Sequence, residues 1–268
     1  MPTETVDEVL AALDSVVEGA WLERSPVGYF ASMYRTVTAT VKDGLDAGLF
    51  DDPERMQALD VVFANRYLEA IAAQGSSPPP TESWQVTFDA AGRWRPIVLQ
   101  HLLVAINAHI NLDLGIAAAE VAPGEALPDL RQDYERINEI LGALVETVRT
   151  HVVEVSPWVG LAERFSGRDD AIVRFSIVVA RREAWRFANR LAPLPLDQWE
   201  GPVAERDAEV SRLARRMLRP GMLSVALLPV RLRERADVRE VIDVLRAMPA
   251  PDLADIEARV RRRQTGGR

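Results

Sequence analysis

Apolar residues recur along most of the chain at the spacing of an α-helix. Over Val6–Val17 they fall at intervals of three and four residues, which marks one apolar face of an amphipathic helix. Strands would show runs of alternating apolar and polar residues bounded by turn residues, and the sequence contains none. The pattern predicts an all-α protein, a multi-helix bundle with little or no β structure.

Glycine and proline residues divide this pattern into segments. Asp52 before Pro53 is a strong helix start signal, and the helix that it begins extends to about Gln74. The stretch from Gly75 to Gly92 is expected to be irregular, a lid or binding loop, with at most a short strand at Trp84–Phe88. Further helices are expected over residues 29–47, 128–155, 169–191, 202–218, 220–228 and 235–247.

The longest apolar run extends from Ile97 to Val121 and predicts a central helix over about 96–121. Its length would suit a membrane span, but it contains histidine, asparagine and aspartate side chains, which are costly in hydrocarbon. We therefore expect a buried helix of a soluble protein, with no membrane partner.

Pro193 and Pro195 interrupt the helical pattern, and the last third has a narrower apolar stripe. We expect a helical core domain, residues 1–192, and a C-terminal helical extension, residues 193–268, that packs on the core as part of one compact unit.

The composition narrows the classes of partner and site. The net charge is −8, and phosphate binding needs a basic face, so nucleic acid is not expected as a partner. The absence of cysteine excludes disulfides, thiolate metal sites and cysteine nucleophiles. No glycine-rich phosphate loop is present, so no cofactor is expected. The acidic N-terminus has no apolar signal-peptide core, which favours a cytoplasmic protein, and the sequence is compatible with a homodimer.

Two pairs of polar residues interrupt the central helix. At 100° per residue, His109 and Asp113 share one face, at about 80° and 120° from His101, and Asn107 and Asn111 share another, at about 240° and 280°. Buried polar groups need hydrogen bonds or line a cavity. The pairs either bridge to neighbouring helices as structural contacts, or His109 faces a pocket while Asp113 fixes its tautomer and raises its basicity. In the second interpretation His109 and Asp113 are catalytic, and His101, Asn107 and Asn111 contact the substrate.

Other predicted helices carry mixed polar and aromatic positions. Asp133 and Arg136 lie three residues apart, and Arg181, Trp185 and Asn189 form one stripe that we expect to face inward. Ion pairs that tie helices together would explain each set. A polar, aromatic-walled cavity for a small organic ligand would explain them too. On that interpretation the further substrate contacts are Tyr67, Asp133, Arg136, Arg181 and Trp185.

The segment His101–Gly115, which contains Asn-Ala-His-Ile-Asn-Leu-Asp-Leu, resembles the signature of a large uncharacterised family that is common in actinobacteria. Weaker similarity extends to Asp60–Tyr67, Asp133–Asn138 and Ala180–Asn189. Since members of this family have no known function, the resemblance supports the fold and implies no activity.

Three classes of function remain. The first is a cofactor-independent enzyme in which His109 and Asp113 transfer protons on a small molecule, in a dehydration or a cyclisation such as spiroketal closure in bacterial secondary metabolism. The second is a metal-dependent ester or phosphodiester hydrolase, for which the histidines and carboxylates are few. The third is a non-catalytic ligand-binding or assembly protein. The residues suit acid–base chemistry better than metal binding, so the first class is preferred and no metal site is assigned.

Overall fold

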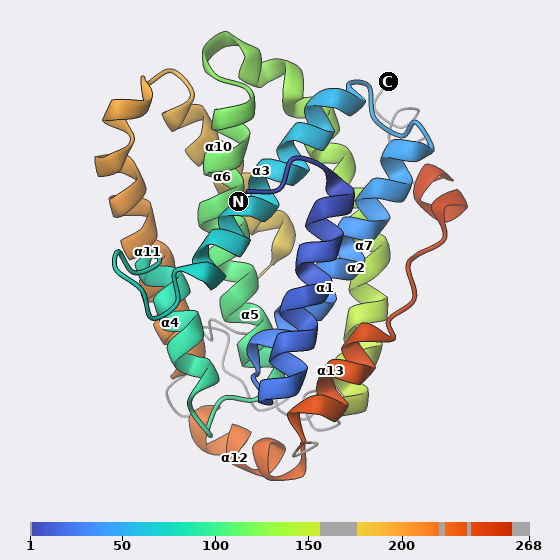
Figure 1. Cartoon of the computed structure of the whole chain (residues 1–268), viewed down its shortest axis with the longest axis vertical. Helices are drawn as coiled ribbons and strands as arrows, with labels where there is room; N and C mark the ends of the chain where they lie inside the picture. Colours follow the sequence, from blue (N-terminus) through green and yellow to red (C-terminus); the bar gives the residue numbers. More distant parts are fainter. Residues whose placement is uncertain (1, 156–175, 220–222, 235–236, 259–268) are drawn as a thin grey trace.

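The computed structural model describes residues 2–155, 176–219, 223–234 and 237–258, and these contain helices and no strand. The all-α multi-helix prediction is therefore confirmed. The principal helices, shown in Figure 1, are α1 (Val6–Glu23), α2 (Val27–Asp46), α3 (Pro53–Ala72), α4 (Glu82–Ala91), α5 (Val98–Ala108), α6 (Leu114–Val121), α7 (Leu127–Val155), α10 (Ile177–Leu191), α11 (Glu200–Leu218), α12 (Leu223–Arg233) and α13 (Val238–Arg246).

The central helix consists of α5, a π-helical segment and α6. Helix α10 packs along α6, α4 and α11 pack on α5, and α2 packs on α5 from the other side (Figure 1). Val98–Val121 is long and apolar enough to cross a membrane, but 89% of its most apolar window is buried inside the protein. It is therefore the core helix of the bundle, as in a soluble protein.

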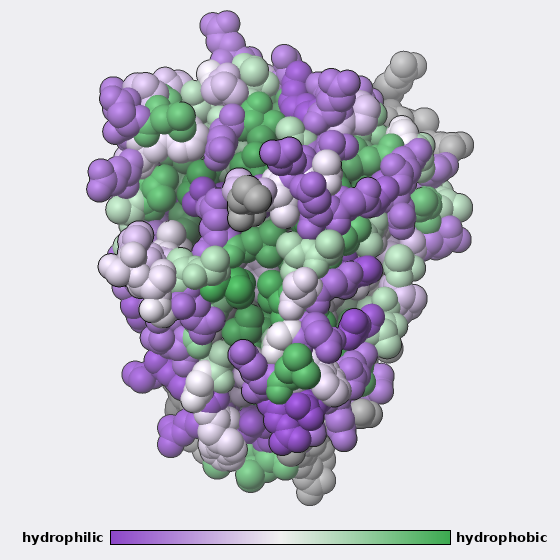
Figure 2. All heavy atoms as spheres, in the orientation of Figure 1, coloured by the Kyte–Doolittle hydropathy of each residue, from purple (hydrophilic) through white to green (hydrophobic). Residues whose placement is uncertain are grey.

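One apolar core joins both ends of the described chain. Its buried side chains extend from Val6 in α1 to Ile256, and helices α11 and α13 both contribute to it. Hydrophilic residues predominate on the face shown in Figure 2, with apolar residues visible between them. The helices after Pro195 thus share the core of the earlier helices, because their apolar faces are buried against α2, α4 and α5.

The segment before the central helix is irregular up to Thr81, as expected, but residues 82–91 form a helix, so the loop prediction is wrong there and the predicted strand is absent. Helix α4 occupies Glu82–Ala91 and buries Trp84 and Phe88, whose rings stack 5.6 Å apart. Its first two backbone N–H groups donate to Asp207 of α11, over 2.6 Å from Glu82 and 2.9 Å from Ser83. The Thr81 side chain at the N-cap position makes no capping hydrogen bond, so this distant carboxylate caps the helix instead.

The sequence led us to expect one regular α-helix at the centre, but the central helix contains an irregular turn. His109–Asp113 forms a π-helical turn, in which the Leu114 N–H donates to the His109 carbonyl five residues back. Such turns insert one residue into a helix and are frequent at functional sites. All five of its residues are buried.

Candidate functional site

An apolar cavity of about 240 Å³ lies between α2, α3, α7, α10 and the central helix. Its wall consists mainly of leucine, isoleucine, valine, methionine and phenylalanine side chains. The exceptions are Tyr34, Asp60, His109 and Arg181. The cavity is the candidate functional site, since ligand sites combine an apolar wall with a few placed polar groups.

The π-helical turn holds His109 in a defined orientation on this wall. His109 Nδ1 lies 3.2 Å from Asp113 Oδ2. The same oxygen accepts from Trp84 Nε1 over 2.9 Å, and Asp113 Oδ1 accepts from Arg66 Nε over 3.4 Å. Because the carboxylate only accepts, Nδ1 carries the proton and the lone pair is on Nε2, which is buried and has no partner among the described residues.

Aromatic rings surround the His109 imidazole. Phe63 stacks on it with ring centroids 3.7 Å apart, and Tyr34 and Phe30 meet it edge-on at 4.5 and 5.6 Å. Burial lowers the pKa of His109, and Arg66 lowers it further, against the opposing effect of Asp113. The imidazole is therefore neutral at neutral pH, and its free nitrogen can accept a proton or a hydrogen bond.

Asp60 and Tyr34 add polar atoms to the same cavity. Asp60 Oδ2 is buried and, within the described chain, has no hydrogen-bond partner. The buried Tyr34 hydroxyl interacts with the side chain of Thr38. Burial raises the pKa of Asp60 to about 7, and burial together with the Asp60 charge raises the pKa of Tyr34. At neutral pH a large share of Asp60 is thus protonated and can donate a proton.

The sequence contained a signal for Asp60 that our site prediction missed. Met56, Leu59 and Phe63 form a buried stripe on α3, and Asp60 is a charged residue inside that stripe. Tyr34 gave no such signal, because a buried tyrosine is ordinary in a core.

His101 and Tyr67 lie near the cavity without lining it. The His101 ring meets Tyr29 edge-on at 5.8 Å, and burial, with a contribution from Arg231, lowers the pKa of His101 to about 4. Tyr67 packs behind His109, with ring centroids 6.0 Å apart. Both are among the predicted substrate contacts, and neither is part of the cavity wall.

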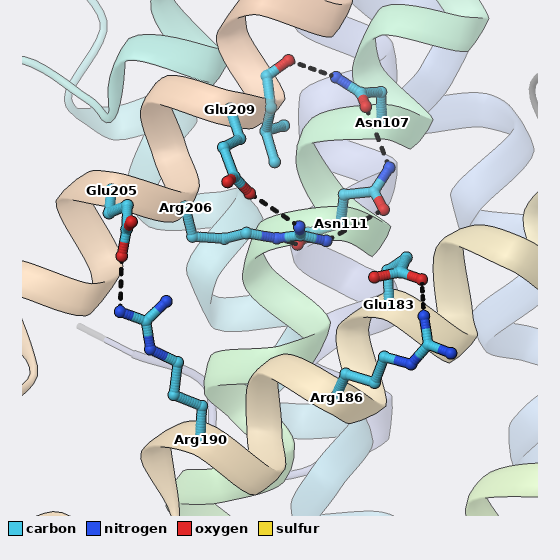
Figure 3. Close-up of polar contacts among 9 residues, drawn as sticks. Asn107, Asn111, Glu183, Arg186, Arg190, Glu205, Arg206 and Glu209 are labelled. Carbon is cyan, nitrogen blue, oxygen red and sulfur yellow. Dashed lines mark hydrogen bonds and ion pairs between the residues drawn. The ribbon is translucent and has the colours of Figure 1, made fainter.

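The two asparagines form a link between helices, shown in Figure 3. Asn111 Nδ2 donates to Asn107 Oδ1, and Asn107 Nδ2 donates to the Val210 carbonyl of α11, each over 3.0 Å. Arg206 of α11 donates to the Asn111 carbonyl over 2.9 Å. This arrangement attaches the central helix to α11 on the side away from His109, and neither asparagine lines the cavity.

The side chains of Asp133 and Arg136 extend from α7 to the residues just before α3. Asp133 accepts from the backbone N–H groups of Asp51 and Asp52 over 2.9 and 2.8 Å. Arg136 forms ion pairs with Asp133 at 2.7 Å and with Asp51 at 2.6 Å. These contacts cap α3 from α7, and both side chains lie outside the cavity.

Arg181 and Trp185 lie on the inner face of α10, as their spacing predicts, while Asn189 is exposed, so the expected inward stripe is wrong at its third position. Arg181 lines the apolar cavity. Trp185 lines a separate cleft of about 440 Å³ between α7 and α10, whose wall also includes Arg181.

Within the described part of the chain, no three histidine, aspartate or glutamate side chains lie close enough together to hold a metal ion. The hypothesis of a metal-dependent hydrolase therefore gains no ligand set from these residues.

Comparison with known proteins gives one match. The model of a family described as a family of unknown function, DUF5995, matches residues 6–220. The curated proteins and the solved structures give no match to the chain. The expectation of an uncharacterised family is confirmed, and the match says nothing of its activity.

Proposed function

The chain belongs to the DUF5995 family, whose function is unknown, and we propose that it is a cofactor-independent enzyme that transfers protons on a small, largely apolar organic molecule. In this proposal His109 is the base, Asp60 is the acid, and Asp113 positions the histidine. The reaction class is a cyclisation or a dehydration, and the protein acts in the cytoplasm.

One observation carries the proposal. His109 Nε2 and Asp60 Oδ2 are buried without described partners, and both residues line one otherwise apolar cavity. Leaving a buried polar group unpaired costs about 1–3 kcal/mol. A ligand whose oxygen atoms bind these two groups would remove that cost, and its hydrocarbon part would fill the rest of the cavity.

The protonation states suit a paired transfer. His109 is neutral and accepts a proton at Nε2, while Asp60, with a pKa of about 7, supplies one. In a dehydration, His109 removes a proton from carbon as Asp60 protonates the departing hydroxyl, and water leaves. In a cyclisation, His109 removes the proton of a hydroxyl that adds to a carbonyl, and Asp60 protonates the carbonyl oxygen. Proton return from His109 to Asp60 restores both groups.

The cavity limits the size of the substrate. Sites for drug-sized ligands measure about 300–1,000 Å³, and this cavity is about 240 Å³. The apolar wall also suits a second candidate function, binding of a small apolar molecule without turnover. The experiment must therefore measure binding and proton transfer separately.

A simple ketone in heavy water tests both steps without the natural substrate. Octan-2-one is incubated with the protein in D₂O, binding is measured by calorimetry, and deuterium at the carbons beside the carbonyl is measured by mass spectrometry. We expect the wild-type protein to bind the ketone and accelerate exchange. His109→Gln should keep its helical circular dichroism and lose about a hundredfold or more of the exchange rate. Asp60→Asn should slow exchange as well.

His101→Gln is the matched control, because it changes a second buried histidine outside the cavity. Its exchange rate should remain at the wild-type level. Binding without exchange would contradict the proposed enzymatic function and favour the second candidate, binding without turnover. A wild-type protein that neither binds nor exchanges the ketone contradicts both candidates.

A further inference from the structure

Arg181 separates the apolar cavity from the cleft between α7 and α10, since it lines both. Its side chain is held from two directions by α7. Nε donates to the Asn138 side-chain oxygen over 2.7 Å, and a second nitrogen donates to the Tyr134 carbonyl. The guanidinium also lies 4.3 Å from the centre of the Tyr134 ring.

The positive charge of Arg181 is buried without a counter-ion from the described residues. The residue is 3% exposed, and among the described residues no carboxylate lies within ion-pair distance of its guanidinium. Glu135 contributes to the electrostatics at Arg181 but is bound by Arg131. A buried charge that is bonded only to neutral oxygens retains a large desolvation cost, which an anion would offset.

The cleft beside Arg181 is rich in arginine. Glu135 is the single acidic residue on its wall, against four arginines, in a chain whose net charge is −8. Two of the arginines have partners. Arg131 pairs with Glu135, and Arg186 pairs with Glu183, which Figure 3 shows. Arg182 is exposed and has no ion pair with any described residue. The wall residues are Arg131, Tyr134, Glu135, Asn138, Val178, Arg181, Arg182, Trp185 and Arg186.

Two of the arginines contact aromatic rings on the wall of the cleft. Arg131 lies 5.0 Å over the Trp185 ring, Trp185 lies 4.7 Å from Tyr134, and Arg181 lies 4.3 Å over the Tyr134 ring. Guanidinium groups that are held in this way lose little further entropy on binding an oxyanion. The cleft therefore has the charge and the rigidity of an anion site.

We propose that the substrate is an amphiphilic anion, whose hydrocarbon part occupies the apolar cavity and whose carboxylate or phosphate binds Arg181 and Arg182 in the cleft. The same two helices form both regions, since Ile137 and Ile177 line the cavity and the next residue in each helix, Asn138 or Val178, lines the cleft. This inference rests on the proposed function, because it names the substrate class of that site.

Three probes with the same chain and different head groups test the inference. Octanoate, octyl phosphate and octan-1-ol are titrated into the full-length protein by calorimetry. The anions should bind about tenfold or more tightly than the alcohol, as expected for a charge-assisted hydrogen bond. The preferred anion distinguishes a carboxylate from a phosphate substrate.

Two variants locate the head-group site, and a third is the control. Arg181→Met replaces the guanidinium with a shorter, uncharged side chain and should abolish the preference for the anions over octan-1-ol. Arg182→Gln changes an exposed residue that should not affect folding, and should weaken anion binding about two- to fivefold. Arg35→Gln, a surface arginine paired with Asp14, should behave as wild type.

The outcomes separate the inference from the proposed function. Equal binding of all three probes, unchanged by Arg181→Met, would overturn the inference and leave the cavity proposal standing. If no probe binds, the proposed function fails as well. Inorganic phosphate that binds as tightly as octyl phosphate would show an anion site independent of the cavity, and would contradict a single ligand that spans both.

Discussion

Phe63 lies flat on His109, with ring centroids 3.7 Å apart and planes inclined by only 10°. Phe63 follows Asp60 by one helical turn on α3, so a single helix carries the proposed acid and the ring that orients the proposed base. Asp113 fixes the imidazole through Nδ1. Stacking and hydrogen bonding together leave Nε2 as the free atom of the ring.

Asp113→Leu should release the proton of His109 from Nδ1. Asp113 Oδ2 is the acceptor for Nδ1, and without it no partner keeps the proton on Nδ1 and the lone pair on Nε2. Nitrogen NMR of the labelled histidine ring reports the tautomer directly, and deuterium exchange of octan-2-one should fall with it. An unchanged tautomer would show that Asp113 does not control the proton position.

Asp60→Asn should change how the free energy of unfolding depends on pH. Burial raises the pKa of Asp60 from 3.8 to about 7, so the folded state retains a proton that the unfolded chain releases. Wild-type stability should therefore fall, relative to the variant, as the pH rises from about 4 to 7, by at most about 4 kcal/mol. Urea unfolding across this range measures the difference.

The buried histidines have the opposite effect, because burial lowers their pKa and the folded state loses stability as the pH falls below 6.5. This contribution is common to wild type and Asp60→Asn, and it cancels in the comparison. Asp14→Asn, at an exposed ion pair, serves as control and should differ from wild type by less than about 1 kcal/mol at any pH. If the free energies of unfolding of wild type and Asp60→Asn changed with pH in parallel, the raised pKa of Asp60 would be contradicted.

Asp133→Ala should destabilise the fold and leave ligand binding intact. The variant loses the carboxylate that accepts from Asp51 and Asp52 at the start of α3, at a cost of about 2–3 kcal/mol. Because Asp133 lies outside the cavity wall, the affinity for octan-2-one should stay at the wild-type value. Chemical unfolding and calorimetry of the same preparation give both quantities. A loss of affinity in a folded variant would show that Asp133 contributes to ligand binding after all.

Local sequence predicted the features that depend on local contacts. Asp52 caps α3 through the Arg55 N–H, as its position before Pro53 indicates. The helical spacing also paired His109 with Asp113 and Asn107 with Asn111, and both pairs are hydrogen-bonded. The start of α4 could not be predicted in this way, because its cap is Asp207, 125 residues away in the chain.

The residues of the cavity wall could be predicted only in part, because the local sequence does not show which distant residues a side chain meets. A polar residue on an inward helix face can line a cavity or cap a neighbouring helix, and its spacing does not distinguish them. Asp133 and Asp60 both occupy such faces, yet Asp133 meets two backbone N–H groups and Asp60 Oδ2 meets none. Only the packing of α7 against the start of α3 decides between these outcomes.

Gly115 should be required for the close packing of α6 on α10, which carries Arg181. A Cβ at this position would lie 2.8 Å from the Ala184 carbonyl oxygen and 2.9 Å from Phe187 Cδ1. The backbone contact cannot be relieved by a change of rotamer, so Gly115→Ala should lower the free energy of unfolding by about 1–3 kcal/mol. Displacement of α10 should also weaken octanoate binding, since Arg181 would move with the helix.

Gly19→Ala is the matched comparison, because Gly19 is also inside a helix but a Cβ there meets nothing within 4 Å. Alanine has the higher helix propensity, so this variant should gain about 0.5–1 kcal/mol. Urea unfolding of both variants should therefore give changes of opposite sign. Two stabilising changes would mean that α6 and α10 are not packed as closely as the 2.8 Å contact requires, and the position of Arg181 between the cavity and the cleft would then have to be revised.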